Sequence, residues 1–207
     1  MINLISDKYE IIKPNEFGRR LTVRFKQYEY NEPIEQTNWK ISKNGCGPTS
    51  IATVLASFNY NETPISIAKI MLFNEFGFLS EGYYDGINGV SMIYCLNKLI
   101  NQYNMNIEYE IVKINYENPE KMKDKIISMI GNGYMAIVSV GPHPNIFANE
   151  GHYIVITSLN KNNNEFYVSN SYPEGDTQID ITFSYEQIVK DIYKDNFDFL
   201  MIRKRDL

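Results

Sequence analysis

Three side chains, Cys46, His152 and Asn170, are of the types that together can perform nucleophilic catalysis at a carbonyl carbon. A thiolate is a strong nucleophile, an imidazole can take up and return the thiol proton, and an amide oxygen can hold the imidazole ring in one orientation. A cysteine, a histidine and an asparagine in this order along a chain form a known catalytic arrangement. The sequence therefore predicts that these three side chains meet in one site.

Cys46 is expected to begin a helix, because the apolar run Ile51–Ala56 follows it closely. Pro48 suits the first helical turn, where its missing N–H has no intrahelical partner. Gly45 and Gly47 would leave room for a substrate to approach the sulfur. The positive end of the helix and a neighbouring imidazolium would both lower the pKa of the thiol, so we expect a thiolate–imidazolium pair. Taken alone, the motif also fits a small buried cysteine at a helix N-terminus.

His152 and Asn170 are expected at the ends of two strands. His152 follows Gly151 and precedes the apolar stretch Tyr153–Leu159, although a single histidine on a strand is more often structural than catalytic. Asn170 closes a second β-like stretch and would accept a hydrogen bond from the His152 ring. The other histidine, His143, lies between two prolines and is expected in a surface loop.

An oxyanion formed at the carbonyl would need hydrogen-bond donors. The backbone N–H of Cys46 is one, and a glutamine side chain could supply the other. Gln27, which follows a predicted strand, and Gln36, which is nearer to Cys46 in the sequence, are both candidates. Either glutamine taken singly could also be a solvated polar residue.

The elements that must position these side chains form a helical first half and a β-rich second half. Alternating polar and apolar residues predict a strand over Leu21–Phe25 in the first half. The order predicts an α+β fold, with N-terminal helices packed on a C-terminal antiparallel sheet. We expect helices over Cys46–Phe58, Ile65–Phe73, Ser91–Tyr103, Pro119–Ile130 and Phe183–Tyr193, and strands over Tyr134–Val140, Tyr153–Leu159, Glu165–Asn170 and Phe197–Arg203.

Several blocks together resemble the C39-like branch of the papain-fold cysteine peptidases. One block of that branch is an aromatic-x-Gln followed by a Trp, here Phe25–Gln27 and Trp39. The next is Ile-x-x-x-Gly-Cys-Gly-Pro-Thr-Ser, here Ile41–Ser50, and a later one is Gly-His-aromatic-Ile-Val-Ile-Thr, here Gly151–Thr157. A further block, aromatic-x-Val-x-Asp-Pro, corresponds to Phe166–Ser171.

The resemblance implies a single papain-like catalytic domain over residues 1–207. It implies Cys46 as the nucleophile, His152 as the acid and base, and Gln27 as the oxyanion donor. Asn170 stands where the family usually has Asp, and its amide could still orient His152. The implied activity is hydrolysis of a peptide or amide bond through an acyl-enzyme. The same residues could transfer the acyl group to an amine, and a non-catalytic papain-like module that binds peptide is a further alternative.

Composition narrows the class of partner. The net charge of the 207 residues is −5, so nucleic acid is not expected, and the implied partner is a peptide or protein substrate. No membrane span is expected, because the longest apolar runs have the length of strands. Met1–Lys8 has no apolar signal region, which predicts a cytoplasmic protein, or a secreted one if a leader has been removed. No metal or other cofactor is expected, Cys95 is predicted to be a buried core thiol, and the sequence does not indicate the oligomeric state.

Overall fold

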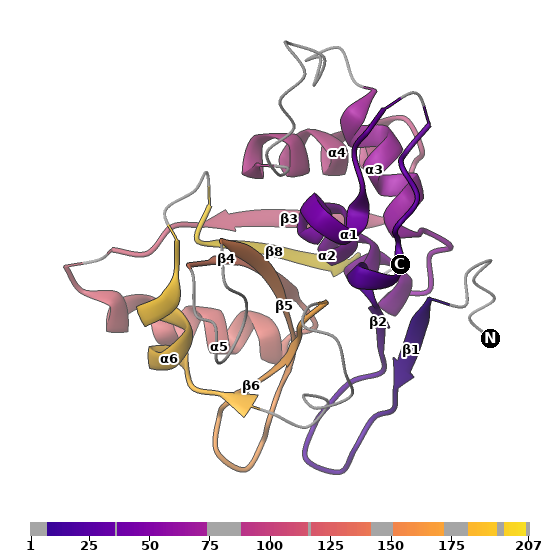
Figure 1. The fold of residues 1–207 in the computed structure, drawn as a ribbon. Coiled ribbons are helices and arrows are strands. Elements are labelled where there is room, and N and C mark those ends of the chain that lie inside the picture. Colours follow the sequence, from indigo (N-terminus) through magenta and orange to yellow (C-terminus); the bar gives the residue numbers. More distant parts are fainter. Residues whose placement is uncertain are drawn as a thin grey trace.

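The fold is built on a six-stranded sheet in a computed structural model of the chain (Figure 1). The strand order is β3-β8-β4-β5-β6-β7, and every neighbouring pair is antiparallel. A separate two-stranded ribbon pairs β1 with β2. The structure describes residues 8–35, 37–73, 88–115, 117–141, 151–171, 182–193 and 197–205, so the predictions for Gln36 and His143 lie outside the described residues.

The strands of the large sheet all come from the second half of the chain. The first of them, β3, lies at one edge of the sheet and pairs with β8 along its length. The strands are β1 (Tyr9–Ile12), β2 (Thr22–Phe25), β3 (Ile107–Val112), β4 (Met135–Val140), β5 (His152–Leu159), β6 (Phe166–Ser169), β7 (Thr182–Phe183) and β8 (Phe199–Lys204).

The helices begin where the sequence places helix-starting residues. The Thr63 hydroxyl accepts a hydrogen bond from the backbone N–H of Ser66, and the Ser66 hydroxyl accepts one from the backbone N–H of Thr63. Pro64 occupies the first turn between them. The helices are α1 (Ile41–Asn44), α2 (Cys46–Ser57), α3 (Pro64–Leu72), α4 (Gly89–Asn101), α5 (Lys123–Gly131) and α6 (Tyr185–Asp191), with short 3-10 turns at η1 (Gln27–Glu29) and η2 (Pro119–Met122).

The large sheet has a hydrophobic core on each face, because successive side chains of a strand point to opposite sides. Ile137 of β4 packs with side chains of α2, α3 and α4, whereas its neighbours Ala136 and Val138 pack with those of α5 and α6. This is the predicted α+β fold, with N-terminal helices on a sheet of C-terminal strands.

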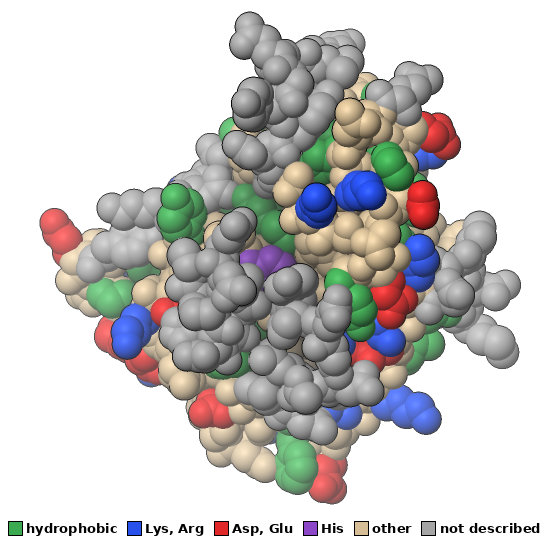
Figure 2. Space-filling view, in the orientation of Figure 1, with side chains coloured by type: hydrophobic (Ala, Val, Ile, Leu, Met, Phe, Trp, Pro, Cys, Tyr) green, Lys and Arg blue, Asp and Glu red, His purple; other side chains and the backbone are tan. Residues whose placement is uncertain are grey.

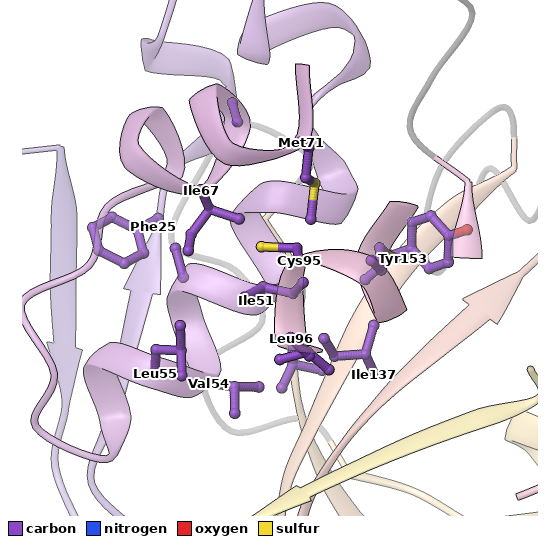
Figure 3. Close-up of a cluster of buried hydrophobic side chains, with 14 of the residues drawn as sticks. Phe25, Ile51, Val54, Leu55, Ile67, Met71, Cys95, Leu96, Ile137 and Tyr153 are labelled. Carbon is purple, nitrogen blue, oxygen red and sulfur yellow. The ribbon is translucent and has the colours of Figure 1, made fainter. Parts of the chain in front are cut away.

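Helix α2 is buried from Gly47 to Ala56 and forms the centre of the first core. Figure 3 shows its side chains Ile51, Val54 and Leu55 among those of β2, α3 and α4. Cys95 of α4 lies in the same cluster and is fully buried, which confirms that it is a core thiol. Packing on all sides fixes α2, and with it the position of Cys46 at its first turn.

Sequence reasoning missed four short elements: β1, β3, β7 and α1. The omission of β3 has a clear cause, because Glu108 and Glu110 give the segment a polar character. In the fold both glutamates are accommodated at the sheet edge, where Glu108 pairs with Arg203 of β8 and Glu110 pairs with Lys125 of α5. The unpredicted strand β3 therefore forms one edge of the main sheet.

Candidate active site

Cys46 is the first residue of α2, as predicted, and the N-terminus of this helix lies against β5. Ser50, one turn further along α2, donates a hydrogen bond of 3.3 Å to the backbone oxygen of Tyr153. The backbone N–H of Tyr153 in turn donates to the sulfur of Cys46. The thiol is thus held beside the residue that directly follows His152.

Gly45, just before the cysteine, is required by packing. A Cβ atom at this position would lie 2.6 Å from the backbone of Ile41 in α1. The absence of a side chain therefore lets α1 and α2 meet at a sharp junction. The expectation that Gly45 makes room for a substrate is wrong, because this space is filled by Ile41.

The pKa of the Cys46 thiol is raised from its ordinary value by burial. Hydrogen bonds from the backbone N–H groups of Tyr153, Gly47 and Cys46 itself lower the pKa, but by less than burial raises it. These backbone contributions nevertheless favour negative charge that develops on the sulfur during a reaction.

His152 and Asn170 are brought together at the ends of two neighbouring strands. His152 begins β5, and Asn170 directly follows β6, which pairs with β5. The His152 Nε2 and the Asn170 Oδ1 are 2.8 Å apart, and both residues are buried. Because an amide oxygen only accepts hydrogen bonds, Nε2 carries the proton, and in the neutral ring Nδ1 is the basic nitrogen.

Burial lowers the pKa of His152 from 6.5 to about 4, and the hydrogen bond with Asn170 raises it by a smaller amount. The ring is therefore neutral at physiological pH. Both pKa shifts oppose the expected thiolate–imidazolium pair, because desolvation disfavours the charged form of each group. In the resting site, a neutral thiol lies next to a strand that begins with a neutral imidazole.

Alkylation of Cys46 by iodoacetamide should therefore be slow at about pH 6 and should accelerate only as the pH rises above the range of an ordinary thiol. The reason is the sign of the shift: a raised pKa moves formation of the thiolate to higher pH. The labelling rate of each cysteine can be followed by mass spectrometry against pH. Cys95 is the internal control, because burial raises its pKa to about 12 and its side chain is inaccessible. Rapid labelling of Cys46 at pH 6 would instead establish an ion pair.

Gln27 lies in η1, directly after β2, and its side chain is buried and oriented. The Ser171 hydroxyl donates a hydrogen bond of 3.0 Å to its Oε1, and its backbone N–H donates to the backbone oxygen of Ser171 at 3.3 Å. With Oε1 held in this way, the Nε2 donors are the part of the amide that can serve an oxyanion. Ser171 follows Asn170 directly, so the short segment Asn170–Ser171 contacts both His152 and Gln27.

A small patch of histidine surface is visible near the centre of the face shown in Figure 2. His152 itself is 6% exposed. Such burial keeps most water away from the ring, which strengthens the hydrogen bonds and charges that act inside the site.

The family of the chain follows from a comparison with known protein families. The family model described as Peptidase_C39 like family matches residues 28–197, a range that contains Cys46, His152 and Asn170. The chain belongs to the Peptidase_C39 like family. Gln27 lies one position outside the matched range, so its assignment depends on its geometry. No curated protein matches the chain significantly.

A solved structure of a C39-like peptidase shares the fold. A putative C39-like peptidase from Bacillus anthracis superposes with a TM-score of 0.51 at 12% identity, covering 79% of this chain and 90% of that one. The peptidase domain of Streptococcus ComA, a bi-functional ABC transporter involved in a quorum sensing pathway, gives a TM-score of 0.49 at 16% identity, over 78% of this chain and 93% of that one. The superposition with the Bacillus anthracis structure shows that this member of the Peptidase_C39 like family has the papain-like fold that its sequence resembles.

Two further findings concern the described part of the chain. No group of three or more His, Cys, Asp or Glu side chains there could hold a metal ion. None of its helices is both long and apolar enough to cross a bilayer.

Sequence reasoning missed the residues that support the site, Ser171 and Arg24. Ser171 stands where the family pattern has proline, and this difference from the pattern is the signal by which the sequence could have revealed its role. Arg24 is the charged residue inside the predicted strand Leu21–Phe25, and its burial could have been suspected only with the partner strand in view.

Proposed function

We propose that this chain is a cysteine peptidase or amidase that cleaves a peptide or amide bond through an acyl-enzyme. The observation that carries the proposal is the contact of 2.8 Å between the His152 Nε2 and the Asn170 Oδ1. His152 begins β5, and the backbone N–H of the next residue, Tyr153, donates to the Cys46 sulfur. A buried structural histidine also needs a hydrogen-bond partner. What fits a catalytic base here is that the partner fixes the tautomer and orientation of a ring at the start of β5, the strand that packs against the cysteine helix.

The first half of the reaction forms the acyl-enzyme. As the Cys46 sulfur attacks the substrate carbonyl, the thiol proton passes to the His152 Nδ1, so charge develops only during the attack. The Cys46 N–H and the Gln27 Nε2–H donate to the resulting oxyanion. The imidazolium then gives its proton to the leaving nitrogen as the C–N bond breaks, leaving a thioester on Cys46.

The second half of the reaction releases the acyl group. Water attacks the thioester carbonyl while the His152 Nδ1 takes the water proton, and the same proton then returns to the Cys46 sulfur as the C–S bond breaks. Asn170 holds the ring throughout by accepting from Nε2–H. An amine that replaced water would give acyl transfer by the same steps.

The proposal can be tested with a peptide library incubated with the protein before and after alkylation of Cys46. New N-termini that appear only with the unmodified protein are expected, and their flanking sequences would define the specificity. Added hydroxylamine would divert the thioester to a hydroxamate, which separates acyl-enzyme chemistry from direct hydrolysis. Amine-capped products in place of free acids would indicate a transferase, and peptides that bind without cleavage would indicate a binding module.

Gln27→Ala is expected to lower kcat by roughly 10²–10³-fold, the usual effect of losing one oxyanion donor. Gln27→Glu is a sharper variant of the same test, because a carboxylate can still accept from Ser171 but has no N–H to donate. Both substitutions should reduce kcat more than they raise KM in steady-state assays. Gln36→Ala serves as the control, and a larger loss there than at Gln27 would reassign the donor.

A further inference from the structure

Arg24 is a buried cation that joins the β1–β2 ribbon to the segment that carries Asn170. Its side chain is 5% exposed, and its Nε–H donates a hydrogen bond of 2.6 Å to the backbone oxygen of Asn170. Its Nη1 donates to the Glu10 carboxylate, also at 2.6 Å. Glu10 and Arg24 are directly opposite each other in the antiparallel register of the ribbon.

A buried guanidinium at this position calls for an explanation. Val23 and Phe25, the neighbours of Arg24 on β2, point into the hydrophobic core, so the strand is anchored without it. Removing a charge from water is costly unless the charge is paired and hydrogen-bonded. Arginine has what a smaller or neutral residue lacks, a rigid fork of donors that can hold a carboxylate and a carbonyl oxygen at once.

The carbonyl group that Arg24 holds belongs to Asn170, the residue that orients His152. The register between β5 and β6 ends at Ser169, so Asn170 lies just beyond the ladder of the sheet. Its side-chain oxygen contacts His152 and its backbone oxygen contacts Arg24. A shift of this backbone would move Oδ1 relative to the ring, and with it the direction in which Nδ1 points.

We propose that Arg24, held by Glu10, is a positioning residue that acts through Asn170 on the orientation of the His152 ring. The inference rests on the proposed function, because a fixed orientation matters only if the ring takes part in a reaction. Arg24 itself touches none of the reacting atoms. Its contribution is to hold the backbone of Asn170 in place, within a series of contacts that runs from Glu10 to the His152 ring.

The kinetic test replaces the pair by Glu10→Gln/Arg24→Met, which keeps the approximate side-chain sizes and leaves no unpaired carboxylate. We expect kcat to fall by roughly tenfold to 10²-fold with KM little changed, as for a catalytic group displaced by a fraction of an ångström to an ångström. In an Asn170→Ala background the same pair of substitutions should produce no further loss. A full additional loss in that background would show that Arg24 does not act through Asn170.

Arg20→Met is the matched control for loss of a partly buried arginine. Arg20 holds the backbone oxygens of Ile130 and Tyr134 at the end of α5, so its replacement should lower thermal stability without changing kcat. Arg24→Lys should recover part of the activity, because a single ammonium can reach one of the two acceptors. An unchanged kcat in folded Glu10→Gln/Arg24→Met would overturn the proposal.

A proton NMR measurement keeps the inference separate from the question of activity. The buried Nε2–H of His152, hydrogen-bonded to Asn170, should give a slowly exchanging low-field signal in the wild-type protein. That signal should broaden or disappear in Glu10→Gln/Arg24→Met and persist in Arg20→Met. If no substrate is turned over, the proposed function fails, and the signal still decides whether Arg24 fixes the ring. An unaltered signal in the double variant would contradict the positioning role.

Discussion

Cys46→Ala is expected to abolish turnover and to leave the fold intact. The covalent step needs the sulfur, and no other described group next to the start of β5 could form the thioester. Alanine is well tolerated near the start of a helix, and the following residues of α2 remain buried. Turnover of a cleaved peptide and the thermal unfolding midpoint should be measured on the same preparation.

Cys95→Ala is the matched control for the loss of a thiol. Cys95 lies in the hydrophobic core, so its replacement should cost some stability through a small cavity and should leave kcat unchanged. Hydrolysis by Cys46→Ala at the wild-type rate would remove Cys46 from the mechanism. The chain would then be better described as a peptide-binding module with a papain-like fold.

His152→Ala should cost at least about 3 kcal/mol of transition-state stabilisation, by analogy with the removal of a triad base. This corresponds to a loss of roughly 10²-fold or more in kcat/KM. The physical reason is that the raised pKa of Cys46 makes spontaneous thiolate rare, so attack depends on a base that removes the proton. Steady-state rates over a range of pH provide the measurement.

Hydroxide should partly replace the missing base, so the deficit of His152→Ala should narrow as the pH rises. The comparison variant is His143→Ala, at the other histidine of the chain, which should cost far less. If the two effects were reversed, the base would be His143. Equal and small effects would argue against histidine-assisted attack altogether.

The parts of the site that could be predicted are those with local signals. The apolar run after Pro48 indicates a helix that begins near Cys46, and the block Gly151–Thr157 indicates a strand that begins near His152. Neither signal depends on the rest of the fold. The same holds for Asn170, which closes a short β-like stretch.

The parts that could not be predicted depend on tertiary packing. The hydrogen bond between Ser171 and Gln27 joins residues 144 positions apart, and neither side chain signals the other in the sequence. The pKa shifts of the half-buried Cys46 and the buried His152 oppose the expectation, because desolvation of each group outweighs the hydrogen bonds that favour its charged form. Burial is set by what the rest of the chain places around a residue, and a local motif does not contain that information.

The contacts of Arg24 and Gln27 with the segment Asn170–Ser171 have a consequence for the protein during its own synthesis. Arg24 and Gln27 are among the first described residues to leave a ribosome, and their partners Asn170 and Ser171 emerge more than 140 positions later. Until then the nascent chain has its cysteine but lacks the partner that orients its histidine. Under the proposed function, a ribosome-bound chain would therefore hold a thiol before it had peptidase activity, and the activity would appear only after strands β3 to β6 had been translated.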